Sequence, residues 1–209
     1  MAASRGAAMA EVVLFPHALG VTDGVRAFAR LLEDAGHTVH VRDPFDGETF
    51  DDVESGVARA RELGFDAIAQ RDAEAVAGLP AGLVYLGMSL GVMSAQPLAQ
   101  NRPGARGAVL LYSCVPPEEF GSWPAGLRAQ VHGMDDDPYF AHEGDLDAAR
   151  ALAAAEPSVE LFVYPGSGHL FAEPGAPGHD EDAARLLTRR VLDLLDELDA
   201  GAPRGTAEA

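Results

Sequence analysis

Two kinds of hydrophobic pattern alternate along the chain. Short runs in which nearly every residue is apolar, such as V-V-L-F at 12–15, are typical of buried strands. Longer segments with apolar residues three or four positions apart, such as Leu187, Val191 and Leu194, are typical of helices packed on one face. The pattern predicts strands at 12–15, 37–41, 83–86, 107–113, 127–132 and 159–164, and helices at 22–36, 50–63, 66–77, 90–100, 145–155 and 180–198.

The order of these elements predicts an α/β fold. Continuously apolar strands separated by helices indicate a mostly parallel sheet of about six to seven strands, with helices on both faces. We expect one domain over residues 10–200, because a chain of 209 residues can bury one sizeable core and shows no internal repeat or linker. Residues 1–9 and 201–209 are predicted to be flexible tails.

The charge and the cysteine count narrow the classes of partner and compartment. The formal net charge is −18, and such an acidic surface repels nucleic acid and anionic membranes, so neither is expected as a partner. The single cysteine, Cys114, excludes an internal disulfide framework. No stretch approaches the roughly 18 apolar residues of a membrane span, and no secretory signal is recognisable, so the expected location is the cytoplasm.

Residues that could take part in catalysis follow the predicted strands. Open parallel sheets bind ligands at the carboxyl ends of their strands, so the residues directly after each strand are the candidates for a site. Ser89 follows the strand at 83–86, and His169 follows the strand at 159–164. An acidic triplet follows the strand at 127–132. We therefore expect a serine, an acid and a histidine at one edge of the sheet.

Ser89 stands in G-M-S-L-G, which matches the G-x-S-x-G pattern of a nucleophile elbow between a strand and a helix. In so tight a bend, side chains at Gly87 and Gly91 would collide with neighbouring backbone, and Ser89 would adopt strained geometry. The amide of Leu90, at the start of the helix, would point at a developing oxyanion. The alternative is an ordinary turn rich in small residues.

A serine nucleophile needs a base, and His169 is the best placed histidine. It lies in a glycine-rich loop after the last predicted strand, and the order serine, acid, histidine is that of an α/β-hydrolase. The acid that would orient the imidazole is one of Asp135, Asp136 and Asp137. Spacing alone does not choose among the three.

Taken together, these residues resemble the dienelactone hydrolase family of α/β-hydrolases. The resemblance runs from about Val12 to the last predicted helix and implies an α/β-hydrolase fold that cleaves an ester or lactone. It implies Asp137 as the acid, with Asp136 as the second choice, and the amide of Ala18 as a second oxyanion donor. The segments that carry it are F-P-H-A-L-G (15–20), R-D-P-F-D-G (42–47), G-M-S-L-G (87–91), V-H-G-M-D-D-D-P-Y-F (131–140) and Y-P-G-S-G-H-L-F-A (164–172).

The chain departs from the best-known members of this family at three positions. Ser89 stands where they carry a cysteine, which implies serine-esterase chemistry, and Cys114 is expected to be packed rather than nucleophilic. His17 replaces a glutamate beside the oxyanion hole. Glu173 replaces an arginine that grips a substrate carboxylate, and an acid there would repel that group. The fold and the hydrolytic class therefore carry over better than the dienelactone substrate.

The leading hypothesis is a serine hydrolase that forms an acyl-enzyme on a small-molecule ester or lactone, as a monomer or homodimer. No cofactor and no metal are expected, because the chain has no G-x-G-x-x-G after the first strand, no P-loop and no metal-ligand spacing. The side chains expected to line the substrate pocket are His17, Tyr112, Trp123 and Phe171. For the three aromatic residues among them, packing in the core is the alternative.

Two other functions fit the same residues. One is a non-catalytic protein of this fold that binds a small ligand or a partner, against which the complete set of serine, acid and histidine argues. The other is an acyl transferase or a carbon–carbon hydrolase, which would use the same serine and histidine, so the sequence does not separate it from an esterase.

Overall fold

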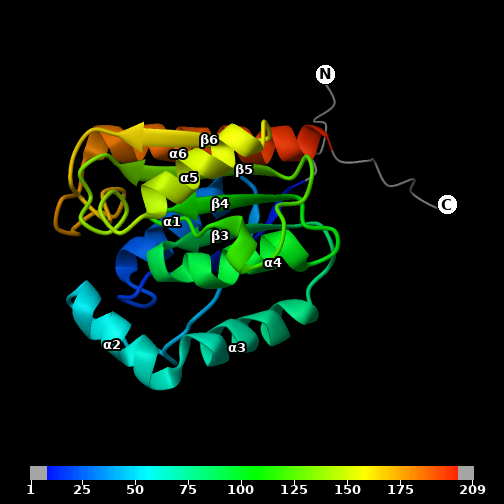
Figure 1. Ribbon diagram of the computed structural model, residues 1–209. Coiled ribbons are helices and arrows are strands. Elements are labelled where there is room, and N and C mark those ends of the chain that lie inside the picture. The colour runs from blue at the N-terminus through cyan, green and yellow to red at the C-terminus, as the bar shows by residue number, and fades with distance from the viewer. Residues whose placement is uncertain (1–8, 202–209) are drawn as a thin grey trace, which may run out of the picture.

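Residues 9–201, the part of the chain that the computed structural model describes, form a six-stranded parallel sheet between layers of helices (Figure 1). The strand order is β2-β1-β3-β4-β5-β6. The strands are β1 (Glu11–Phe15), β2 (Thr38–Val41), β3 (Leu83–Met88), β4 (Gly107–Leu111), β5 (Arg128–Met134) and β6 (Val159–Tyr164). The helices are α1 (Asp23–Asp34), α2 (Val53–Leu63), α3 (Phe65–Ala77), α4 (Val92–Asn101), α5 (Asp145–Ala155) and α6 (Glu181–Ala200), with 3-10 turns η1 (Ser89–Gly91) and η2 (Pro117–Glu119).

The strands and helices predicted from the hydrophobic pattern are all confirmed, and the differences lie at their ends. β4 ends at Leu111, two residues before the predicted end, and β5 continues two residues beyond it to Met134. The helix predicted from residue 90 begins instead at Val92, after the 3-10 turn that contains the serine. The predicted tails lie outside the described residues, except for Met9 and Gly201.

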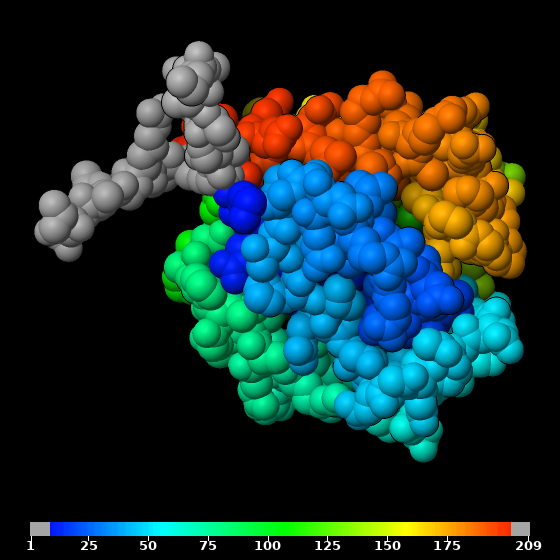
Figure 2. Space-filling view, turned by 180° about the vertical axis from the view of Figure 1, so that it is seen from behind, coloured from blue at the N-terminus to red at the C-terminus, as the bar shows by residue number. Residues whose placement is uncertain are grey.

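The sheet separates two apolar cores because side chains alternate between the faces of a strand. On one face, Val12 and Leu14 of β1 pack with residues of α1 and α6, which lie side by side in the view from behind (Figure 2). On the other face, Val13 and Phe15 pack with residues of α3, α4 and α5. Both faces of the sheet are therefore covered, which confirms the α/β class. No helix within residues 9–201 is long and apolar enough to cross a membrane.

Helices α2 and α3 form a smaller layer of their own, below α4 in Figure 1. We call this unit the α2–α3 layer. Its apolar centre consists of the buried side chains of Phe45, Ala60 and Ile68, and the ring of Phe50 meets that of Phe45 edge to face at a centroid distance of 5.2 Å. This centre is much smaller than either core beside the sheet.

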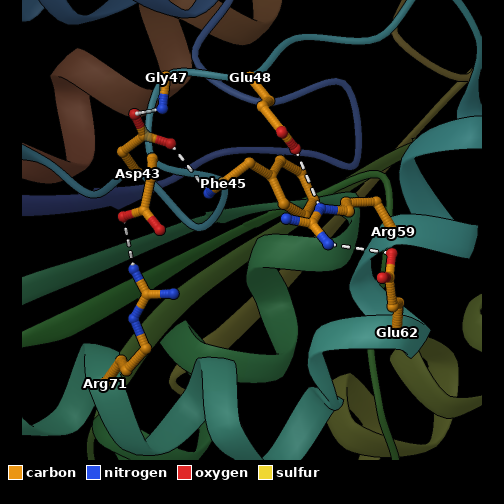
Figure 3. Close-up of polar contacts among 8 residues, drawn as sticks. Asp43, Phe45, Gly47, Glu48, Arg59, Glu62 and Arg71 are labelled. Carbon is orange, nitrogen blue, oxygen red and sulfur yellow. Dashed lines mark hydrogen bonds and ion pairs between the residues drawn. The ribbon is translucent and has the colours of Figure 1, made fainter.

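Polar contacts of the loop after β2 are one part of the attachment of the α2–α3 layer (Figure 3). The carboxylate of Asp43 accepts hydrogen bonds from the amides of Phe45 and Gly47, at 3.0 and 2.8 Å, which fixes the shape of the loop. Arg71 of α3 then donates to Asp46 at 2.8 Å, and Arg59 of α2 donates to a glutamate of the same loop. The segment R-D-P-F-D-G thus ties the layer to the sheet.

Candidate active site

Ser89 lies in the bend between β3 and α4 with a backbone φ of 47°. A positive φ is unfavourable for a serine and persists only where the surrounding structure imposes it. A Cβ added at Gly87 would lie 2.7 Å from the Cα of Val92, and one added at Gly91 would lie 2.8 Å from the carbonyl oxygen of Pro16. Both glycines are therefore required by close backbone approach, for the reason that the G-x-S-x-G pattern suggests.

Ser89, His169 and Asp137 form a chain of hydrogen bonds across three strand ends. The Oγ of Ser89 lies 2.8 Å from Nε2 of His169, and Nδ1 of His169 lies 2.7 Å from Oδ2 of Asp137. Because a carboxylate can only accept, Nδ1 carries the hydrogen and Nε2 presents its lone pair to the serine hydroxyl. In this tautomer the imidazole is ready to take the proton of Ser89.

The three consecutive aspartates differ in their surroundings. Asp137 is 0% exposed, and its second carboxylate oxygen accepts the amide of Tyr139 at 2.9 Å. Asp135 and Asp136 are exposed and bond to other groups of the neighbouring loops. Of the three candidates, Asp137 is therefore the one that the structure brings to His169.

The loop after β1 has a fixed orientation beside the serine bend. The carbonyl of His17 accepts the amide of Gly20 at 3.0 Å. Because the C=O and N–H of a trans peptide point in opposite directions, the amide of Ala18 points away from Gly20. Among residues 9–201 that amide donates to no other backbone group. The same loop touches the serine bend at Gly91, so the amides of Ala18 and Leu90 belong to two adjoining segments.

His17 and Glu173 form a pair next to this loop. Nε2 of His17, a residue only 1% exposed, lies 2.5 Å from Oε2 of Glu173, and Oε1 of Glu173 accepts the hydroxyl of Thr22 at 2.6 Å. Burial alone would raise the pKa of the Glu173 carboxyl, but the hydrogen bonds from His17 and Thr22 bring that pKa below its usual value. Glu173 therefore holds other side chains of the protein instead of facing a substrate.

A cavity of about 530 Å³ opens beside Ser89 and His169. Val53 and Val57 of α2 and Phe65 at the start of α3 line it on one side. Its volume lies within the roughly 300–1,000 Å³ typical of small-molecule sites. The cavity therefore joins the α2–α3 layer to the residues at the strand ends.

The charged side chains of this cavity are mostly acidic. Glu54, Glu143 and Asp145 line it, and Arg61 is the one arginine among the described lining residues. Asp145 accepts the hydroxyl of Ser113 at 2.5 Å, and burial raises the pKa of its carboxyl. Among residues 9–201, no three histidine, cysteine or acidic side chains are grouped so as to hold a metal ion. The lining as a whole disfavours an anionic ligand relative to an uncharged one.

Of the four candidate wall residues, the structure brings Tyr112 to this cavity, where its ring lies 5.8 Å from that of His169 between centroids. It does not bring His17, Trp123 or Phe171 there. His17 pairs with a glutamate, Trp123 donates its indole N–H to a backbone carbonyl in the core, and Phe171 is fully buried against Tyr112. For these three the expectation of a pocket wall is corrected, because each side chain is turned into packing behind the site.

Sequence reasoning missed two features of the site. Tyr139 covers His169 with ring centroids 4.6 Å apart and donates its hydroxyl to Glu54 at 2.9 Å. Burial, together with the bond to Glu54, raises the pKa of Tyr139 to about 12. The second missed feature is that side chains of α2 line the cavity. The signal in the sequence was the i, i+4 spacing of Val53 and Val57 on an otherwise polar helix.

Cys114 does not line the cavity, and its side chain lies in the core between the sheet and α4 and α5. It is 0% exposed, and burial raises the pKa of its thiol to about 12. Since the thiolate is the reactive form, both burial and the raised pKa disfavour reaction at this cysteine, which is packed as expected.

The model of the dienelactone hydrolase family matches residues 1–198. Among solved structures, the protein named m3DLH has a TM-score of 0.73 and 24% identity, with 94% of this chain and 89% of that chain covered. A dienelactone hydrolase-like promiscuous phosphotriesterase from metagenomic libraries has a TM-score of 0.69 and 21% identity, with 93% and 88% covered. A cold-adapted esterase from an Arctic intertidal metagenomic library has a TM-score of 0.62 and 18% identity, with 92% and 83% covered.

At these identities the structural likenesses show the fold, which is the α/β-hydrolase fold. The search of curated proteins gave no match.

Proposed function

The chain belongs to the dienelactone hydrolase family and is a hydrolase that acts on ester bonds, and we propose that it cleaves an ester or lactone through a Ser-His-Asp triad. The observation that carries this proposal is the unbroken chain of hydrogen bonds from Ser89 Oγ through His169 to the buried Asp137. Such a chain gives a weakly nucleophilic hydroxyl the base that it needs.

In the acylation step, Ser89 Oγ attacks the carbonyl carbon while its proton passes to Nε2 of His169. The negative charge that develops on the carbonyl oxygen is stabilised by the amides of Leu90 and Ala18, whose loops adjoin at Gly91. His169 then returns the proton to the leaving alkoxide, and the acyl group remains on Ser89. Asp137 keeps its negative charge throughout and stabilises the imidazolium.

In the deacylation step, a water molecule takes the place of the alcohol. His169 accepts a proton from the water as it attacks the acyl carbonyl, and the same two amides stabilise the second tetrahedral intermediate. Collapse of this intermediate releases the acid and returns the proton to Ser89 Oγ. For a lactone, the leaving alkoxide stays attached to the acyl group, so a hydroxy acid is released.

We expect the substrate to be an uncharged ester or lactone. The cavity beside Ser89 combines apolar side chains of the α2–α3 layer with the carboxylates of Glu54, Glu143 and Asp145. A substrate carboxylate would meet mostly like charges there, whereas an uncharged acyl group would pack against the apolar side. The proposed setting is the cytoplasm, and the proposed assembly is a monomer or homodimer.

The test is to replace the nucleophile and keep the cavity. Ser89→Ala should lower the kcat for short p-nitrophenyl esters by about 10⁴-fold or more and abolish labelling by a fluorophosphonate. Ser113→Ala is the matched control, because Ser113 also lines the cavity but its hydroxyl donates to Asp145 and does not contact His169, so labelling should persist. Equal hydrolysis by the wild type and Ser89→Ala, both folded by circular dichroism, would overturn the assignment.

A further inference from the structure

We propose that the His17–Glu173 pair is a positioning device that holds the amide of Ala18 at the oxyanion site. Neither residue lines the cavity beside Ser89, so the pair would act on the rate of the chemical step without touching substrate. The inference rests on the proposed function, because it concerns the donors that stabilise the oxyanion of that reaction.

The pair links the loop after β1 to the loop after β6 at the carboxyl edge of the sheet. His17 lies in the loop after β1, and Glu173 lies four residues after His169 in the loop after β6. Glu173 also accepts from Thr22, whose hydroxyl oxygen accepts the amide of Val25 and caps α1. Both carboxylate oxygens of Glu173 are therefore engaged, and the first helix anchors the pair.

The hydrogen bonds define the state of the imidazole of His17. Its Nδ1 accepts the amide of Leu19 at 3.3 Å, so Nε2 carries the hydrogen and donates to Glu173 at 2.5 Å. The ring is thus held at both nitrogens, one by its own loop and the other by the histidine loop. A ring fixed in this way also fixes the backbone of His17, because the side chain cannot turn without losing a buried hydrogen bond.

The fixed backbone of His17 determines where the next amide points. The carbonyl of His17 accepts the amide of Gly20 on one side of the peptide plane, which leaves the N–H of Ala18 on the other. On the far side of Ala18, its carbonyl lies against Gly56 of α2, where any larger residue would collide with it. The peptide before Ala18, which carries its N–H, and the peptide after it are therefore both held, so this N–H has one orientation.

Loss of the pair should therefore appear in catalysis more than in substrate binding. Removing an oxyanion donor outright costs on the order of 10²–10³ in turnover, because the donor acts only when the charge develops. Misorienting the donor should cost less, on the order of 10–10². We expect His17→Ala and Glu173→Ala to lower the kcat for a neutral p-nitrophenyl ester by that amount, with KM changed by less than about threefold.

Conservative variants separate the two contacts of the histidine. In His17→Gln, the amide N–H₂ reaches as far as Nε2 and can still donate to Glu173, so we expect most of the kcat to return. In His17→Asn, the side-chain oxygen can still accept the amide of Leu19 but the shorter side chain cannot reach Glu173, so the loss should remain. Glu173→Gln keeps an acceptor for His17 and should recover more activity than Glu173→Ala.

A second readout excludes a merely structural role. A trifluoromethyl ketone forms a hemiketal oxyanion with a nucleophilic serine, so its affinity should fall in parallel with kcat across these variants, while the affinity of an unreactive amide analogue should not. Asp199→Ala is the matched control, because Asp199 is a buried carboxylate paired with Arg106 at 3.0 Å and belongs to α6, outside the cavity lining. It should lower the melting temperature and leave kcat unchanged.

The outcomes distinguish the possible failures. If Glu173→Ala loses melting temperature as Asp199→Ala does but keeps its kcat and its affinity for the ketone, the pair is structural and the inference is wrong. Equal rescue by His17→Gln and His17→Asn would also contradict it. If the wild type neither hydrolyses the ester nor binds the ketone differently from Ser89→Ala, the proposed function itself fails, and the inference fails with it.

Discussion

The carboxyl edge of the sheet and the α2–α3 layer both border the cavity, but different forces hold them in place. At the sheet edge, Ser89, Asp137 and His169 follow strands of the central sheet. The hydrogen bond between His169 and Asp137 is buried, and the one between Ser89 and His169 is partly buried beside the cavity. The α2–α3 layer rests on a few buried side chains around Phe45 and on exposed ion pairs such as that of Arg71 (Figure 3). Helix α3 also contacts the sheet side through Val76 and the buried bond from Ser94 to Asp72.

This difference suggests that the sheet edge carries the chemical step and that the α2–α3 layer selects the substrate. Buried hydrogen bonds between fixed elements keep reacting groups aligned, whereas an exposed ion pair contributes only about 0–1 kcal/mol to stability. We expect changes at the sheet edge to alter kcat, and changes in the α2–α3 layer to alter which substrates bind.

The largest effect should come from the acid of the triad. Asp137→Asn keeps the shape of the side chain but no longer fixes the tautomer of His169, so kcat should fall by about 10⁴-fold. Asp136→Asn is the matched control, because Asp136 is exposed and does not contact His169; its kcat should stay within about threefold. Steady-state kinetics on one neutral ester decides the matter, and a greater loss in Asp136→Asn would reverse the assignment.

The next effect concerns the centre of the α2–α3 layer. Phe45→Ala removes a ring that is 2% exposed and should lower the free energy of unfolding of that layer by about 3–5 kcal/mol. Amide hydrogen exchange in residues 53–77 should rise and KM for apolar esters should increase, while the fluorophosphonate still labels Ser89. Arg71→Gln, which removes only an exposed ion pair, should change stability by less than about 1 kcal/mol.

If Phe45→Ala instead abolished labelling of Ser89 without unfolding the sheet, the two regions would not be separable. The hydrogen-exchange profile of β3 and β5 in the same variant provides this check.

A smaller effect, confined to the sheet, is the loss of folding stability at acidic pH. His132 of β5 is fully buried between Gln130 and Tyr164, and burial, aided by the charge of Arg190, lowers its pKa to about 3. In the unfolded chain the pKa is about 6.5, so the unfolded state binds the proton first. Stability is therefore fully present above about pH 6.5 and is lost as the pH falls toward 3. At about pH 4.5 the loss should be about 2–3 kcal/mol.

The measurement is the free energy of unfolding by urea at pH 7 and pH 4.5. His132→Gln should lose about 2–3 kcal/mol less between the two pH values than the wild type does. His142→Gln, a change at an exposed histidine, should behave as the wild type. The same acid sensitivity in wild type and His132→Gln would exclude His132 as its source.

The smallest effect concerns substrate charge. Asp145→Asn removes one negative charge from the cavity lining and should raise the kcat/KM for a carboxylate-bearing phenyl ester relative to an uncharged ester of matched length by about five- to tenfold. Asp147→Asn, on the same helix but exposed and outside the cavity lining, should leave the ratio unchanged. A ratio that does not move in either variant would show that Asp145 has no part in the selection.

The sequence determined the elements of this protein and the identity of its central motif. The six strands and six helices follow from the spacing of apolar residues, which is a local property of the chain. The bend at Ser89 follows from Gly87 and Gly91, because close backbone approach excludes any side chain at either position. The sequence also predicted the order of serine, acid and histidine after three different strands.

The tertiary structure decided how the loop side chains are paired. Asp135, Asp136 and Asp137 are chemically identical neighbours, and only the packing of the turn after β5 buries one of them against His169. Glu173 was expected to oppose a substrate carboxylate, but it pairs with His17 instead. The carboxylates that line the cavity come from α2, α5 and the loop before α5.

The physical reason is how far apart along the chain the interacting residues lie. Periodicity and turn chemistry act within a few residues, so the sequence alone specifies them. The direction of a side chain in a loop depends on partners far along the chain: Glu173 lies 156 residues from His17. Such pairs form only when the sheet brings the ends of its strands to one edge, and that assembly decided the site.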